Sequence, residues 1–220
     1  SKSPFTLIVG RAIQKGHIKG LDQPIIELVP EFNCEGCEKV TFRSALAMES
    51  GIEQSAEMDR QDSQKGLSQL EAVLARSIVH EPYEWYHYNN AVYRLMFTAL
   101  ENATGMSIPE FTTQELFEPL KMQGAYWVDI RSGGDHMGYQ SIRMRPVDLL
   151  KVGQVILNQG VWNGEQYLPA SYIEELTTAP APKANPSYGL FWHLNSGDFF
   201  LTYAESDRVE GNLMPGTPED

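Results

Sequence analysis

The chain opens with Ser1-Lys2-Ser3-Pro4-Phe5-Thr6 and runs directly into an apolar pattern over residues 5–14. Its apolar side chains recur at intervals of three and four residues: Phe5, Ile8, Val9, Ala12 and Ile13. Side chains at this spacing share one helical face, so the segment predicts a helix packed on a core, with Gly16 at its C-terminal end. Lys2 falls in the first turn of this helix.

A second helix is predicted over residues 90–104, directly after Trp85-Tyr86-His87-Tyr88-Asn89-Asn90. Its apolar stripe comprises Val92, Leu95, Met96, Ala99, Leu100 and Ala103, and Gly105 follows. Ser107 and Glu110 then form a capping box with a proline inside the first turn, which predicts a further helix to about residue 117.

Other elements follow the same rules. Helices are expected at residues 41–48, 68–79, 146–158 and 169–176, with a short helical or extended piece at 25–28. Asn163-Gly164 predicts a small hairpin. After a proline-rich connection, apolar residues occur at every second position, as in a strand with one buried face. Residues 188–194 and 198–204 are therefore expected to pair as an antiparallel hairpin.

These elements predict an α+β fold in one domain, residues 1–220. We expect a mainly helical region over about 5–178 and a partial antiparallel sheet over about 187–220. Two strands alone make a marginal sheet, so further strands are expected from chain beyond both ends. The last residues read as a loop leading into another helix, and we expect a chain truncated at both ends.

Composition restricts the classes of partner. The 220 residues contain 42% hydrophobic residues and carry a net charge of −12. This balance argues against nucleic acid, whose phosphates need a high density of Lys and Arg. No apolar run approaches the roughly 18 residues of a membrane span.

The two cysteines occur as Cys34-Glu35-Gly36-Cys37. Such a pair can be a redox motif, half of a zinc site, or two loop residues that form a tight disulfide in an exported protein. A zinc site needs four ligands, and the sequence has no second Cys pair or H-x-x-x-H. We expect a structural loop with no metal and no cofactor, and the redox state of Cys34 and Cys37 stays open.

Lys2 is the first candidate for chemistry. The positive end of a helix dipole favours the neutral form of a lysine, and burial in a cleft acts in the same direction. A neutral amine one helical turn from a serine hydroxyl can accept its proton. The alternative is a solvated lysine in the first turn of a helix.

Tyr88 and Asn90 are the second group of candidates. A phenol close to an ammonium can act as acid or base for a leaving group. Asn90 can donate to a substrate carbonyl and accept a hydrogen bond from Lys2. The alternative is that Tyr88 is a half-buried aromatic residue and that Asn90 is the N-cap of the helix at 90–104.

Several short segments resemble, in the same order, the serine β-lactamase-like hydrolases. That family includes class C β-lactamases, DD-peptidases, related esterases and 6-aminohexanoate-dimer hydrolases. The segments are Ser1-Lys2-Ser3, Lys15-Gly16-His17-Ile18, Leu21-Asp22-Gln23-Pro24, Val40-Thr41-Phe42-Arg43, Met48-Glu49-Ser50-Gly51, Tyr88-Asn89-Asn90, Phe117-Glu118-Pro119-Leu120, residues 138–144, residues 148–154, residues 158–164 and Tyr188-Gly189-Leu190-Phe191-Trp192.

The resemblance implies a β-lactamase/transpeptidase-like fold and a serine hydrolase that acts on an ester or amide, β-lactams and peptides included, through an acyl-enzyme. Lys2 resembles the lysine of the family's S-x-x-K motif, Tyr88 the tyrosine of its Tyr-x-Asn motif, and Asn90 the partner in substrate binding. Which of Lys2 and Tyr88 accepts the serine proton stays open. The implied substrate is a small molecule, and the implied compartment is periplasmic or extracellular.

Two departures accompany the resemblance. The S-x-x-K serine would lie three positions before Lys2, ahead of residue 1, and neither Ser1 nor Ser3 matches it. The third motif, Lys-Thr-Gly or His-x-Gly on a strand, has no counterpart in the sequence. In the family, the strand with this motif supplies one of the two hydrogen-bond donors to the oxyanion. We therefore expect an inactive fragment of an active parent. The alternatives are a non-catalytic penicillin-binding-like module, used for binding or regulation, and a truncated chain without function.

Overall fold

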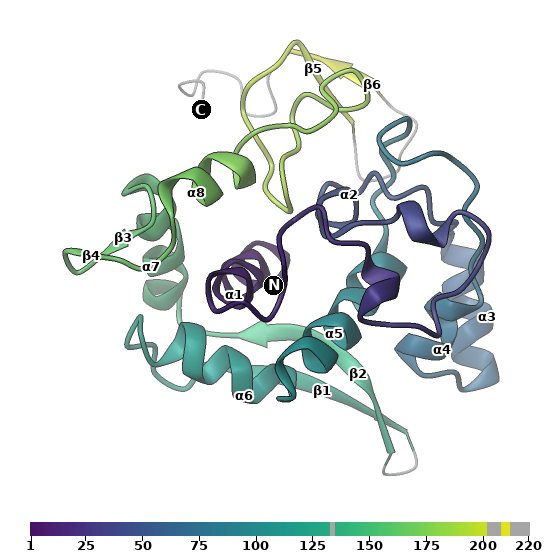
Figure 1. Cartoon of the computed structure of the whole chain (residues 1–220), viewed down its shortest axis with the longest axis horizontal. Helices are drawn as coiled ribbons and strands as arrows, with labels where there is room; N and C mark the ends of the chain where they lie inside the picture. The colour runs from purple at the N-terminus through teal and green to yellow at the C-terminus, as the bar shows by residue number, and fades with distance from the viewer. Residues whose placement is uncertain (133–134, 202–207, 212–220) are drawn as a thin grey trace.

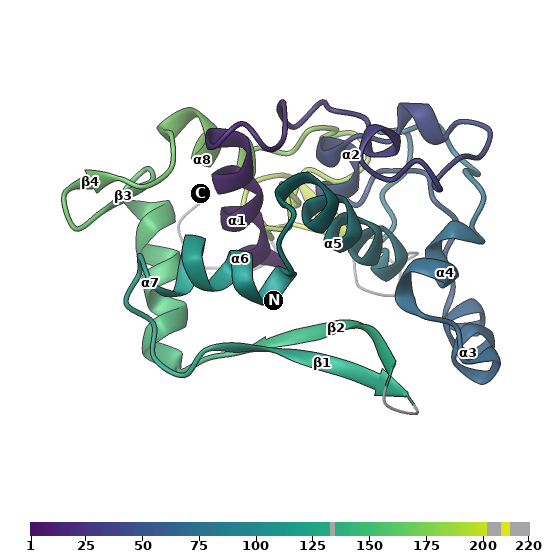
Figure 2. The ribbon, with the colours of Figure 1, turned by 60° about the horizontal axis from the view of Figure 1, so that its bottom comes forward.

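The computed structural model describes residues 1–132, 135–201 and 208–211. The first helix, α1 (Lys2–Gln14), lies between α7 and α8 on one side and α5 on the other (Figures 1 and 2). Because it is surrounded, α1 buries Leu7 in addition to the predicted face. Its Gly10 allows α8 to approach closely, since an added Cβ would lie 2.4 Å from the Tyr172 ring.

The remaining helices are α2 (Phe42–Leu46), α3 (Ala56–Lys65), α4 (Gln69–Leu74), α5 (Asn90–Thr104), α6 (Ile108–Thr112), α7 (Pro146–Leu157) and α8 (Ala170–Leu176). Two short 3-10 helices occur at Ile25–Glu27 and Cys37–Lys39, and α6 continues into a π-helical turn at Thr113–Phe117. The capping box of α6 is formed as predicted, with Ser107 and Glu110 exchanging hydrogen bonds.

An aromatic cluster joins α1 to α5 at the centre of the core. The Phe5 ring packs edge-on against both Tyr93 and Phe97, with ring centroids 5.3 and 5.2 Å apart. All three side chains are at least 95% buried. Such pairs add about 0.5–1.5 kcal/mol beyond area burial, so this contact fixes the first turn of α1 against α5.

The sequence analysis predicted no strands over residues 126–143, and the structure has two there. Strands β1 (Tyr126–Ser132) and β2 (Asp135–Arg143) form an antiparallel ribbon that extends beside α5 and α6 (Figure 2). The indole N–H of Trp127 donates to Thr112 Oγ1 on α6 at 2.9 Å, which anchors one end of the ribbon.

The predicted strand at 188–194 was also wrong. This segment folds back on itself through a single Tyr188–His193 bridge, with Phe191 in the left-handed region at φ 61°. Part of the second predicted strand is present as β5 (Phe199–Leu201), which pairs with β6 (Arg208–Glu210) instead. Residues 202–204 of that prediction, and the predicted C-terminal loop at 214–220, lie outside the described residues.

The helix predicted at 68–79 ends at Leu74. Residues 77–79 leave it because they pair with residues 51–53 through an Ile52–Ile78 bridge. The predicted hairpin at Asn163-Gly164 is confirmed by β3 (Val161–Trp162) and β4 (Glu165–Gln166).

A disulfide joins Cys34, in the loop before the second 3-10 helix, to Cys37, the first residue of that helix. Within the described ranges, no group of three or more His, Cys, Asp or Glu side chains is arranged to hold a metal ion. In the same part of the chain, no helix has the length and apolar character needed to cross a membrane.

Candidate functional site

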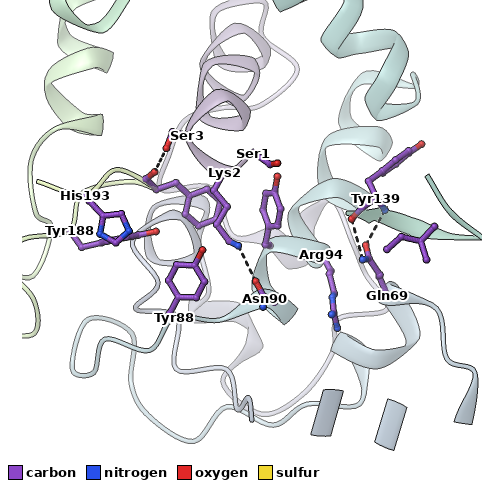
Figure 3. Close-up of a pocket in the computed structure, with 13 residues that line it drawn as sticks. Ser1, Lys2, Ser3, Gln69, Tyr88, Asn90, Arg94, Tyr139, Tyr188 and His193 are labelled. Carbon is purple, nitrogen blue, oxygen red and sulfur yellow. Dashed lines mark hydrogen bonds between the residues drawn. The ribbon is translucent and has the colours of Figure 1, made fainter. Parts of the chain in front are cut away.

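A cleft of about 510 Å³ opens at the start of α1 (Figure 3). Its walls come from five parts of the chain that are far apart in sequence. They are residues 1–3 at the start of α1, Gln69 of α4, residues 88–94 at the start of α5, the β1–β2 ribbon, and residues 188–193. The fold therefore places Lys2, Tyr88 and Asn90 in one cavity.

The Lys2 ammonium lies between groups from two sides of the cleft. Its Nζ donates a hydrogen bond to Asn90 Oδ1 at 2.9 Å, as Figure 3 shows. It also lies 4.6 Å from the centroid of the Tyr88 ring and 4.7 Å from that of Tyr93. Cations at this distance from aromatic faces are attracted to them, so the two rings and the amide hold Nζ at one place.

Burial, together with a smaller contribution from the positive charge of Arg94, lowers the pKa of Lys2 from its usual value to about 8. A lysine with this pKa is partly neutral near physiological pH, and only the neutral amine can accept a proton. The cleft thus contains an amine with the properties of a general base.

Asn89, the residue before Asn90, caps α5. Its Oδ1 accepts hydrogen bonds from the N–H groups of Ala91 and Val92, and its Nδ2 donates to Ile52 O at 2.7 Å. Sequence reasoning had given the capping position to Asn90 as the alternative to a site role, and this was wrong. Because Asn89 satisfies the helix end, the Asn90 amide is available to the cleft.

Neither serine beside Lys2 points its hydroxyl at the amine. Ser3 Oγ donates to the carbonyl oxygen of Phe191 at 2.8 Å, and Ser1 Oγ accepts from the N–H of Ile142 on β2 at 2.9 Å. Both hydroxyls therefore join the walls of the cleft to each other.

Three residues that line the cleft were not predicted from the sequence: Tyr93 and Arg94 from α5, and Gln69 from α4. Tyr93 and Arg94 follow Asn90 by three and four positions, a spacing that places side chains on one helical face and could have identified them. Gln69 gave no such signal, because the ribbon that packs beside it was not predicted.

Comparison with known proteins agrees with this architecture. A family model described as Beta-lactamase matches residues 1–200. Protein flp of Staphylococcus aureus (strain MW2) is 26% identical over 149 residues, which cover 64% of this chain and 30% of that protein. The chain thus spans about a third of that relative's length.

Two solved structures are similar in fold. A protein described as a β-lactamase, from Bacteroides dorei DSM 17855, superposes with a TM-score of 0.71 at 14% identity, over 96% of this chain and 68% of that one. One described as a 6-aminohexanoate-dimer hydrolase, from Bacillus anthracis, gives 0.71 at 17%, over 98% and 66%. These matches confirm the predicted β-lactamase/transpeptidase-like α+β fold, and the chain belongs to the beta-lactamase family.

Proposed function

We propose that this chain is the lysine- and tyrosine-bearing part of a serine hydrolase that acts on an ester or amide through an acyl-enzyme. Lys2 and Tyr88 would be its acid/base groups, and Asn90 would bind substrate. The observation that carries the proposal is the position of Lys2 Nζ, in a cleft, between Asn90 Oδ1 and the Tyr88 ring.

The first step would transfer a serine proton to the neutral Nζ of Lys2 while the serine oxygen bonds to the substrate carbonyl carbon. When the bond to the leaving group breaks, that group would take a proton from the Lys2 ammonium or the Tyr88 phenol. Water would then hydrolyse the acyl ester by the reverse use of the same groups. Asn90 can support both steps. Its Oδ1 accepts from Lys2, and its Nδ2, which forms no hydrogen bond among the described residues, can donate to a substrate carbonyl.

The S-x-x-K pattern places the nucleophile three residues before Lys2, so the proposal concerns this chain together with the residues encoded before Ser1. The test is covalent labelling of that longer chain with a fluorophosphonate probe and with a fluorescent penicillin. Lys2→Ala should slow labelling by about a hundred- to ten-thousand-fold, the usual contribution of a general base. Tyr88→Phe should slow it by a smaller factor.

Two matched variants serve as controls. Lys15→Ala removes a lysine from the other end of α1, and Tyr126→Phe removes a phenol from an exposed position on the ribbon. Both should label at the parent rate. Normal labelling of Lys2→Ala and Tyr88→Phe would refute the assignments. Ligand binding without any labelling would favour a binding module.

A further inference from the structure

The cleft continues beyond Lys2 to Gln69 and Arg94, where it meets two smaller hollows. One, of about 250 Å³, lies between α5 and β2, and the other, of about 210 Å³, lies between α3, α4 and the ribbon. Gln69 and Arg94 line all three spaces. Arg94 therefore lies where the three spaces meet. A ligand whose reacting group lies beside Lys2 could reach Arg94 with the rest of its chain.

The charge of the main cleft is opposite to that of the protein. The chain has a net charge of −12, yet the described residues that line the main cleft include Lys2 and Arg94 and no Asp or Glu. Two like charges in a partly buried space repel each other, and a bound anion would relieve that cost.

The carboxylates in the two side hollows already have partners. Asp59 accepts from Arg94 at 3.1 Å, and Asp62 forms a buried ion pair with Arg76. Glu101 accepts from the N–H of Ile108 at 2.9 Å and from the Tyr139 hydroxyl at 3.3 Å. These groups therefore leave the cations of the cleft only partly neutralised.

The Arg94 guanidinium has N–H donors that no described residue accepts from. Its Nη1 donates to Asp59, and its side chain is 21% exposed. Within the described residues it forms no other hydrogen bond, although a guanidinium carries five N–H donors. Figure 3 shows Arg94 between Asn90 and Gln69, with its guanidinium directed away from Lys2. Asp59 thus occupies Nη1, while Nε and Nη2 remain available to donate two hydrogen bonds to one carboxylate.

We propose that Arg94 is a specificity-determining residue that binds a free carboxylate on the acyl substrate, at a distance from the carbonyl group that reacts beside Lys2. That this ligand is a substrate rests on the proposed function; that the cleft binds a carboxylate at Arg94 does not. Asn90 and Arg94 are separated by one helical turn, about 5–6 Å along α5. The preferred ligand therefore has a spacer of several bonds between its two carbonyl groups.

Binding to the 220-residue chain tests this without any need for turnover. The probes are the monomethyl esters of succinate, glutarate and adipate, each compared with its neutral dimethyl ester by NMR titration. At least one monoester should bind about tenfold or more tightly than its diester, which is the effect of a charge-assisted hydrogen bond. Equal affinity within every pair would overturn the proposal.

Variants separate a binding role from a structural one. Arg94→Gln should abolish the preference for the monoester and leave diester binding unchanged, and Arg94→Lys should retain only part of it. Arg60→Gln removes an exposed cation that pairs with Glu57 and should change nothing. If Arg94 only ties α5 to α3, Arg94→Gln and Asp59→Asn should lower the melting temperature equally and leave the preference intact, which would also refute the proposal.

The outcome is independent of catalysis. If the monoesters bind through Arg94 while the longer chain resists fluorophosphonate, the carboxylate site stands and the hydrolase proposal fails. If the longer chain is labelled and no anion preference appears, the hydrolase proposal stands and the role of Arg94 fails. Monoester binding should in addition raise the pKa of Lys2, because it neutralises the charge of Arg94.

Discussion

The side-chain amide of Gln69 pairs with the backbone of Tyr139 as a neighbouring strand would. Its Nε2 donates to the carbonyl oxygen of Tyr139 at 3.1 Å, and its Oε1 accepts from the N–H of the same residue at 3.2 Å. One residue of α4 thereby joins the ribbon to the helical region beside the cleft. The next residue back, Gly138, has φ 135°, and a Cβ there would lie 2.1 Å from Gln69 Oε1.

We expect Gln69→Ala to lower the free energy of unfolding by about 1–2 kcal/mol, because it removes two hydrogen bonds. Gly138→Ala should also be destabilising, through backbone strain and through the clash with Gln69. The clash is absent when Gln69 is alanine, so the double variant should be more stable than the sum of the two single effects. Urea unfolding of the four proteins in a double-mutant cycle measures this coupling. Strict additivity would contradict it.

Lys2 should titrate near pH 8. The midpoint can be read from the NMR signal of its ε-carbon, assigned by comparison with Lys2→Met. Arg94→Gln should raise the midpoint, because it removes a neighbouring positive charge. Since the pKa is lowered on folding, the unfolded chain binds more protons between about pH 8 and the ordinary lysine value. Stability should therefore rise with pH across that window, and Lys2→Met should lack this component.

Glu49 should make the free energy of unfolding decrease as the pH rises from about 4.5 to about 8. Its side chain is 1% exposed, and neither carboxyl oxygen has a hydrogen-bond partner in the described part of the chain. Burial raises its pKa from 4.5 to about 8, so the folded state binds more protons between these values. The free energy of unfolding should decrease across that range by a few kcal/mol.

The variant Glu49→Gln tests this expectation, because it keeps the shape of the side chain and removes its ionisation. At pH 8 it should be more stable than the parent, and its stability should change less between pH 5 and pH 8. Glu31→Gln, at an exposed position, should keep the parent's pH dependence. A Glu49→Gln variant that follows the parent curve would show that the carboxyl group is solvated.

At Phe191, we expect the glycine variant to be more stable than the alanine variant. Its φ of 61° is unfavourable for any residue with a Cβ, yet its ring is buried against Tyr93. Removing the ring should cost about 3–5 kcal/mol. Among the truncated variants, Phe191→Gly should be more stable than Phe191→Ala by about 1 kcal/mol, since glycine adopts this conformation without strain.

The control for Phe191 is Phe111, a buried residue within α6. There the alanine variant should be the more stable, by about 1 kcal/mol, because glycine is unfavourable inside a helix. Chemical denaturation of the four variants gives the two differences directly. An alanine variant that is the more stable one at both positions would mean that the conformation at Phe191 carries no strain.

The helices with a strong apolar stripe could be predicted from the sequence, and those without one could not. The helix at 90–104 was predicted with its observed bounds, because its buried face recurs at helical spacing and Gly105 ends it. Helix α3 was missed, since its only buried residue is Asp62 and its sequence shows no apolar face. Its signals were local ones, the cap at Ser55 and the left-handed Gly66.

The strand prediction at 188–194 failed for a different reason. Alternating apolar residues indicate one buried face, but here Leu190 and Phe191 are both buried in a turn that enters the core. The ribbon was missed although Gly133-Gly134 separates its two strands, which is a hairpin signal. At the site, the contact between Lys2 and Asn90 was expected from the chemistry of the two side chains. The helical spacing from Asn90 could have placed Arg94 on the same face of α5, whereas its nearness to Gln69 and the ribbon depends on the cavity geometry.

Asn89 caps α5, whereas the proposed function gives the neighbouring Asn90 a role in substrate binding. A complete set of substitutions at position 89 should therefore be limited by expression and folding. Ser and Thr should be tolerated best, because each can accept from the free N–H groups of a helix end. Asp can also accept there, but it would place a carboxylate oxygen against the buried Ile52 carbonyl oxygen to which Asn89 Nδ2 donates. A library at position 90 should fold almost without restriction and be filtered by what enters the cleft. Substitutions at position 89 would thus change folding, and those at position 90 would change ligand binding. A screen that measures solubility and binding separately would distinguish these two neighbouring residues.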